Sequence, residues 1–144
     1  MDHVAIMRKS WGLTQKILTG EKKIESRWYK AKHTPWGKIK SGDTIYFKDS
    51  GEPIRIRAKV SRVLQFSNLN PEKVKDLLNK FGKDDGLTKR EIPKYHEMFK
   101  DKKYCLLIFL EDPTRVKPFS IHKQGFGAMS AWVAIKNIRK IILT

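Results

Sequence analysis

Residues 54–60 alternate between apolar and cationic side chains, and no other stretch constrains the fold as strongly. Successive side chains of a strand point to opposite faces, so residues of one parity share a face. The apolar set is Ile54, Ile56, Ala58 and Val60, and the cationic set is Arg55, Arg57 and Lys59. This stretch therefore predicts a sheet with one buried face and one positively charged face.

Strands are predicted to dominate the rest of the chain. The apolar run 104–110 predicts a buried strand, and turn residues at 49–53 predict a hairpin that joins strands 44–48 and 54–66. Ser10 as N-cap and Gly20 as stop bound a predicted helix, while Thr88 and Glu91 match a capping box. The other predicted elements are helices 71–81 and 88–99, strands 4–7, 24–29, 131–135 and 139–143, and a loop at 31–42.

This order of elements predicts an α+β fold that is mainly β. Strands and helices do not alternate regularly, so the pattern does not indicate a parallel sheet. We expect a small twisted β-barrel with short helices packed at its ends. A length of 144 residues leaves little room for two units, so residues 1–144 are expected to form a single domain.

The chain carries 31 basic and 15 acidic side chains, which gives a net charge of +16. Fewer than half of the cations can pair with a carboxylate of the chain, so the others face water or an anionic partner. Nucleic acid is the partner that this excess favours. An anionic membrane surface, or a charge that only keeps the domain in solution, remains open as an alternative.

The single cysteine, Cys105, lies in the apolar run 104–110, which predicts a buried and inert thiol. No segment has the apolar length of a signal peptide or a membrane span, so we expect a cytoplasmic protein with no membrane partner. The histidines are far apart and have no cysteine or paired carboxylate at ligand spacing. No metal or cofactor is therefore expected, and the chain is expected to be a monomer.

Three charged residues fall close together after the predicted stop of the first helix. Glu25 and Arg27 share one face of the predicted strand 24–29, close enough to form an ion pair or to hold one ligand together. Lys22, in the preceding turn, is placed to lean over the same spot. A surface ion-pair cluster is the alternative. Asp84 and Asp85 are either turn formers or a source of a carboxylate for this cleft.

These residues have the spacing G-x-K-x-x-E-x-R, given by Gly20, Lys22, Glu25 and Arg27, and this spacing resembles the signature of the ASCH domain, a PUA-like fold. The resemblance extends over about residues 3–66. Its flanking matches are Ser10-Trp11, Ile17, the segment 40–45 and the segment 58–60.

The resemblance implies a β-barrel with a cleft beside the motif, a cytoplasmic location and RNA as the class of ligand. It also implies a second possibility, because some members are ribonucleases or amidohydrolases that act on acetylated cytidine. The amidohydrolases have threonine in place of the motif's glutamate, whereas this chain has Glu25.

Residues 27–40 interleave cations with aromatic rings, and no acidic residue lies between Glu25 and Asp43. Cations neutralise phosphates and aromatic faces accept unstacked bases, which is the combination that a groove for single-stranded RNA needs. The alternative is a solvated loop with Trp28 and Trp36 packed inward, and Trp28 shares the parity of the apolar Ile24. The glycines around Phe126, beside Ser130 and Trp132, predict a turn or a pocket wall.

Three functional hypotheses follow. The first is a binding module for single-stranded RNA or a nucleotide, in which Lys22 and Arg27 contact phosphate or carbonyl oxygens and Glu25 accepts from base N–H groups. The second is a hydrolase that uses Lys22, with its pKa lowered by Lys23 and Arg27, and Glu25. The third is a charged, stable domain. The candidate ligand-binding residues are Lys22, Glu25, Arg27, Trp11, Tyr29, Lys30, Lys32, Trp36, Arg55, Arg57, Ser130 and Trp132.

Overall fold

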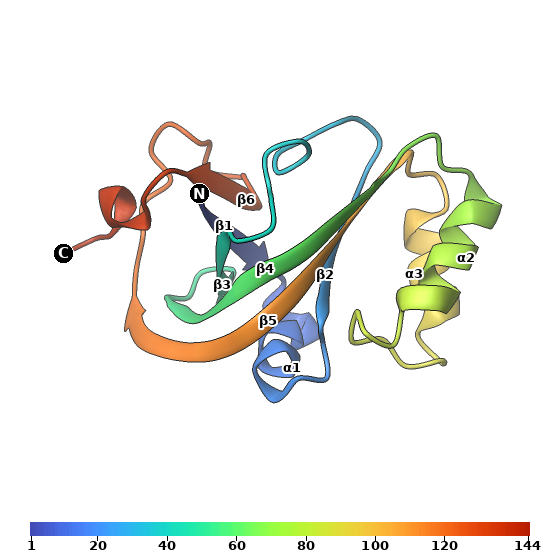
Figure 1. Cartoon of the computed structure of the whole chain (residues 1–144), viewed down its shortest axis with the longest axis horizontal. Helices are drawn as coiled ribbons and strands as arrows, with labels where there is room; N and C mark the ends of the chain where they lie inside the picture. The colour runs from blue at the N-terminus through green and yellow to red at the C-terminus, as the bar shows by residue number, and fades with distance from the viewer.

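A single curled β-sheet organises the computed structural model, which describes all of residues 1–144 (Figure 1). The fold is mainly β, as predicted. In chain order the elements are β1 (Asp2–Met7), the 3-10 helix η1 (Lys9–Trp11), α1 (Leu13–Thr19), β2 (Ile24–Tyr29), β3 (Thr44–Asp49), β4 (Ile54–Phe66), α2 (Pro71–Phe81), α3 (Ile92–Phe99), β5 (Tyr104–Phe119), β6 (Trp132–Ile135) and the 3-10 helix η2 (Ile138–Ile141).

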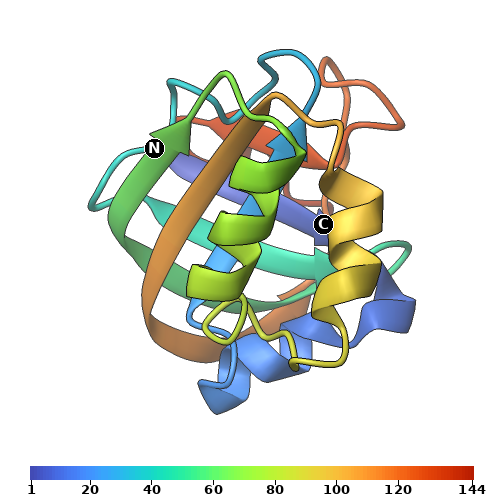
Figure 2. The same ribbon diagram turned by 90° about the vertical axis from the view of Figure 1, so that its right-hand side faces the viewer.

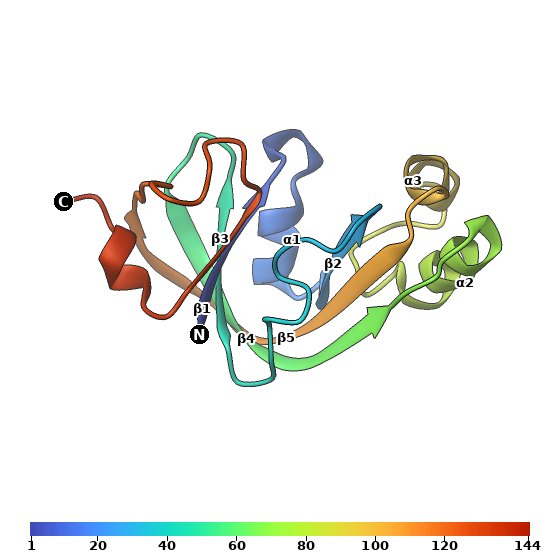
Figure 3. The ribbon, with the colours of Figure 1, turned by 90° about the horizontal axis from the view of Figure 1, so that it is seen from above.

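The sheet has six strands in the order β2-β5-β4-β3-β1-β6. All neighbours are antiparallel except β1 and β3, which are parallel. The long strands β4 and β5 bend together, and the sheet curls into a half-barrel (Figure 3). Since β2 and β6 are the two edges, backbone pairing does not close the expected barrel.

The strand β5 contributes side chains to two separate cores. Leu106 and Ile108 belong to the cluster that also holds Ile17 and Phe47, whereas Cys105 and Leu107 pack in a second cluster beneath the helices. Both faces of this part of β5 are therefore buried. This double burial is the physical reason why the run 104–110 has no polar position.

The helices α2 and α3 lie in the connection between β4 and β5 and cover one end of the sheet (Figure 2). Val74 and Leu78 of α2 and Tyr95 of α3 pack against Ile24 and Trp28 of β2. Asn70 caps α2 by accepting a hydrogen bond from the backbone N–H of Lys73 at 2.8 Å. None of the helices is long and apolar enough to cross a membrane.

Two predicted helix starts are wrong. Gly12 adopts a left-handed conformation, so α1 begins at Leu13 and Ser10 lies in η1 instead of capping the helix. The helix α3 begins at Ile92, although the Glu91 carboxylate accepts a hydrogen bond from the backbone N–H of Thr88 at 2.9 Å. That contact is half of the predicted capping box.

Two predicted strand boundaries are also wrong. Residues 138–141 form η2, capped by the Asn137 side chain, and only Ile142 makes an isolated bridge, to Ile121. The strand β5 continues to Phe119 through two prolines. It pairs with β2 only as far as Phe109, so beyond that point its second edge is free and the missing proline N–H groups interrupt no ladder there.

Gly82 ends α2 where the helix meets α3. Its backbone is right-handed, so glycine is not needed there for its conformation, but a Cβ would collide with the Leu78 carbonyl oxygen and the Ile92 side chain. We expect Gly82→Ala to lower the free energy of unfolding by about 1–3 kcal/mol because this contact cannot relax freely. Urea denaturation measures the effect. Asn79→Ala, exposed on the same helix, is the control and should lose no stability; equal midpoints for both variants would contradict the expectation.

Candidate ligand-binding cleft

A cavity of about 320 Å³ lies between β2, the end of β1 with the segment that follows it, and α3 with the turn that precedes it. Aromatic side chains from both sides form much of its lining. Trp28 and Phe99 stack with centroids 5.0 Å apart and planes at 7°, and Trp11 meets Tyr95 edge-on at 5.6 Å. The aromatic lining residues are Trp11, Trp28, Tyr29, Tyr95 and Phe99.

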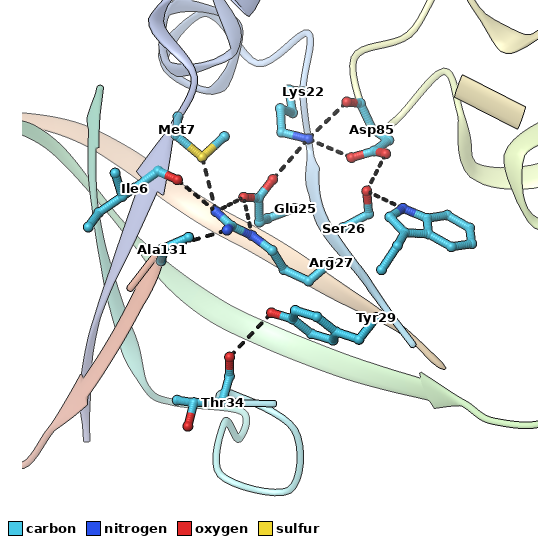
Figure 4. A network of polar contacts seen from close by, with 11 residues as sticks. Ile6, Met7, Lys22, Glu25, Ser26, Arg27, Tyr29, Thr34, Asp85 and Ala131 are labelled. Carbon is cyan, nitrogen blue, oxygen red and sulfur yellow. Dashed lines mark hydrogen bonds and ion pairs between the residues drawn. The ribbon is translucent and has the colours of Figure 1, made fainter. Parts of the chain in front are cut away.

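Lys22 lies at the polar end of this cavity, with only 2% of its surface exposed. A left-handed Gly20 ends α1, and the turn that follows directs Lys22 inward. Its ammonium nitrogen lies 2.5 Å from Asp85 Oδ1, 2.9 Å from the Asp85 carbonyl oxygen and 3.2 Å from Glu25 Oε1 (Figure 4). All three N–H bonds of the ammonium therefore have an acceptor within the protein.

Arg27 extends the network across the open side of the sheet. Its Nε and Nη2 atoms donate to Glu25 Oε2 at 3.1 and 2.8 Å, a fork-like ion pair (Figure 4). The guanidinium also donates to the carbonyl oxygens of Ile6 and Ala131, both at 3.4 Å. Arg27 thus links the edge strand β2 to β1 and to the start of β6.

A hydroxyl joins the aromatic wall to the charged network. The Ser26 hydroxyl donates to Asp85 Oδ2 at 2.6 Å and accepts from the Trp28 indole N–H at 3.1 Å. Asp85 itself lies in the turn between α2 and α3, so this carboxylate ties the helices to β2. Asp85 was predicted either to form a turn or to supply a carboxylate to the Lys22 cleft, and the structure shows its carboxylate in contact with Lys22.

The environment shifts the pKa of each buried member of the network. Burial alone would lower the pKa of Lys22, but Asp85 and Glu25 outweigh it and raise this pKa. Burial opposes the negative charge of Glu25, yet Arg27 and Lys22 lower its pKa. For Asp85, burial prevails over Lys22 and raises the pKa. A lysine nucleophile requires a lowered pKa. That prediction for Lys22 is wrong, because carboxylates surround its ammonium and raise its pKa.

A second hollow, of about 450 Å³, adjoins the first. Arg27, Tyr29 and Ala131 line both of them. The Tyr29 ring is fixed between the two by a hydrogen bond of 3.2 Å from its hydroxyl to the Thr34 carbonyl oxygen (Figure 4). Further lining residues of the second hollow are His33, Lys38, Phe126, Ser130 and Trp132.

Seven of the twelve predicted ligand-binding residues meet at these two hollows. The first contains Trp11, Lys22 and Glu25, the second contains Ser130 and Trp132, and Arg27 and Tyr29 belong to both. The residues that line neither hollow are Lys30, Lys32, Trp36, Arg55 and Arg57.

Each of these five residues has another place in the fold. Lys30 is exposed directly after the end of β2. Trp36 packs edge-on against Tyr104 at 5.2 Å, and Lys32 lies over both rings. Arg55 and Arg57 are exposed on β4, opposite its buried parity, as the alternation predicts.

Ser26, Tyr95 and Phe99 line the cleft but are not among the residues predicted from the sequence. Tyr95 and Phe99 are four residues apart on α3, so their spacing indicates a shared helix face, but nothing in it indicates which surface they meet. No group of three or more His, Cys, Asp or Glu side chains is placed to hold a metal ion.

Several solved structures resemble this chain. The first is ASCH from Zymomonas mobilis, with 15% identity, a TM-score of 0.66 and coverage of 94% of this chain and 87% of that one. A single-residue variant of the same protein has 14% identity and a TM-score of 0.68, and the match covers 96% of this chain and 93% of that one. The hypothetical protein PH0355 has 24% identity and a TM-score of 0.54, and the match covers 79% of this chain and 100% of that one.

This chain has the ASCH-domain fold. The resemblance seen in the motif is thus confirmed at the level of the fold, which is PUA-like. No family's sequence profile and no curated protein sequence matches this chain.

Removing the Lys22 charge should destabilise the protein strongly. Lys22→Met keeps the apolar stem but leaves the Glu25 and Asp85 carboxylates buried without this cation, at a cost of about 3–5 kcal/mol at neutral pH. As pH falls, protonation of these carboxylates removes the uncompensated charges, so the deficit relative to the wild type should shrink. Denaturant unfolding over a pH series measures both effects.

Lys23→Met is the matched control, since Lys23 is exposed beside Lys22. This variant should unfold as the wild type does. A Lys22→Met deficit that is absent, or independent of pH, would contradict the role given to the buried ammonium.

Proposed function

We propose that the cleft binds a base of single-stranded RNA, or the base of a nucleotide. The observation that carries this proposal is the pairing of aromatic walls with a buried, charge-balanced polar network. Flat rings from η1 and α3 face the edge strand β2, and a planar base offers them a stacking surface. A volume of about 320 Å³ falls in the range of small-molecule sites, about 300–1,000 Å³.

The charge balance of the network favours a base over a phosphate at its inner end. Lys22 and Arg27 supply two positive charges, and Glu25 and Asp85 supply two negative ones. The Lys22 ammonium has no N–H left for a phosphate oxygen. We therefore assign Lys22 a positioning role: it orients Glu25, which can accept from a base N–H group.

The phosphates of such a strand would meet cations outside the inner cleft. Arg8 lines the cavity with its side chain over Trp11 at 5.0 Å, and it is exposed. The net charge of +16 supplies further cations over the surface. The ASCH-like motif independently implies RNA as the class of ligand.

Replacement of Trp11 tests the stacking wall. We expect Trp11→Leu, which keeps apolar volume but removes the flat face, to weaken binding of short single-stranded oligoribonucleotides by about 1–3 kcal/mol. Calorimetric titration with homopolymers of each base measures it, and circular dichroism verifies the fold. Affinity for the wild type should fall with salt by about 0.7 log units per log unit for each phosphate contacted.

Trp36→Leu is the matched control, because Trp36 lines neither hollow. Unchanged affinity in Trp36→Leu with a loss in Trp11→Leu supports the cleft. A loss in Trp36→Leu alone would instead support the interface first expected from the sequence, and no binding by the wild type would refute the proposal.

A second candidate function is hydrolysis of RNA or of an acetylated nucleoside. The contact that favours it is the hydrogen bond of 2.6 Å from the Ser26 hydroxyl to Asp85, at the lining of the cleft. In this alternative Asp85 takes the hydroxyl proton as Ser26 Oγ attacks the acetyl carbon or the phosphorus. The proton passes to the departing nitrogen or oxygen as its bond breaks, and a water then hydrolyses the ester formed on Ser26. The Lys22 ammonium favours the ionised form of Asp85 that this step needs. Here Lys22 acts as a cation and not as the nucleophile.

Incubation of the protein with oligoribonucleotides and with acetylated cytidine, followed by chromatography of the products, distinguishes the two functions. Hydrolysis predicts product with the wild type and at least a hundredfold less with Ser26→Ala, with binding retained. Binding of these compounds without product would exclude hydrolysis and support the binding of a base.

A further inference from the structure

The two adjoining hollows differ in charge. The inner cleft holds Glu25 and Asp85 beside its cations, whereas no acidic side chain lines the second hollow. Arg27 and Lys38 are the cations at the second hollow, and Lys38 is exposed. An anionic group bound across the two hollows would therefore be favoured on the side of the second one.

The second hollow also has aromatic walls of its own. Trp132 is buried. Its indole N–H donates to His3 Nδ1 at 3.0 Å, and the Arg27 guanidinium lies 5.0 Å from its ring centroid. Phe126 is half-buried and packs at the edge of a separate core cluster. Phe126, Tyr29 and the exposed imidazole of His33 are thus the rings with surface available to a planar group in this hollow.

Arg27 stands at the boundary with donor capacity to spare. Its Nη2 atom contacts Glu25, Ile6 and Met7, but the only acceptor of Nη1 is the Ala131 carbonyl oxygen, at 3.4 Å. Since Nη1 carries two N–H bonds, one of them has no acceptor in the protein. A phosphate that crosses from one hollow to the other passes this group.

We propose that the second hollow is the subsite for the neighbouring nucleotide, so that the protein recognises a dinucleotide step and not a lone nucleoside. One base occupies the inner cleft, the linking phosphate lies over Arg27 and near Lys38, and the next base packs against Phe126. This inference rests on the proposed binding of a base in the inner cleft. It adds the length of the recognised unit and the place of its phosphate.

Calorimetric titration of the full chain with the four ribonucleosides and with their homodinucleoside monophosphates tests the subsite. We expect the dinucleotide of the preferred base to bind about tenfold or more tightly than its nucleoside, since one further stacked base alone gives at least several-fold. Phe126→Leu and Lys38→Gln should each reduce dinucleotide affinity several-fold and leave nucleoside affinity unchanged. Phe126→Leu keeps the apolar packing while it removes the flat ring.

Lys117→Gln is the control for Lys38→Gln, because Lys117 is exposed on β5 and lines neither hollow. Equal affinities for nucleoside and dinucleotide, or equal effects of Lys38→Gln and Lys117→Gln, would overturn the subsite and leave base binding in the inner cleft intact. Failure of the wild type to bind any nucleoside or dinucleotide would overturn both proposals.

Discussion

The buried ammonium of Lys22 holds the site together. It contacts Glu25 of β2 and Asp85 of the turn between α2 and α3, which are far apart in the chain and adjacent in space. A buried carboxylate without a cation is costly, so these three groups are stable only in company. The position of the helical wall against the sheet, and with it the shape of the cleft, depends on this contact.

Arg27 serves the fold and the cleft at the same time. The sheet has two free edges, β2 and β6, and the Arg27 guanidinium on β2 donates to the carbonyl oxygens of Ile6 in β1 and of Ala131, the residue before β6, where backbone pairing is lacking. The same group forms the boundary between the two hollows. An ion pair that stabilises the fold and a cation that meets a ligand were alternatives at the level of the sequence, but the geometry accommodates both.

The strands with a strong pattern could be predicted, because alternation or a solid apolar run reports burial directly. The helix start at Leu13 could not, since a left-handed Gly12 decides it, and the end of β5 could not, since its free edge tolerates proline. Lys22, Glu25 and Arg27 were found because they are close in sequence. The contact of Asp85 with the Lys22 cleft was only one of two interpretations of this residue, because Lys22 lies 63 residues away in the chain. Trp36 lines neither hollow, because composition does not indicate which cavity a ring faces.

The chain leaves the sheet at Phe66 and returns at Tyr104, and Phe66 and Cys105 are register partners on β4 and β5. The residues between Phe66 and Tyr104 form no strand of the sheet, and they meet it through the core beneath the helices and through the Asp84 carbonyl oxygen, which accepts from the backbone N–H groups of Lys23 and Ile24. Tyr95, Phe99 and Asp85 all belong to this segment, whereas Glu25 and Arg27 belong to the sheet. The lining that comes from α3 can therefore vary while the lining that comes from β2 is kept, provided that a carboxylate for Lys22 remains in this segment.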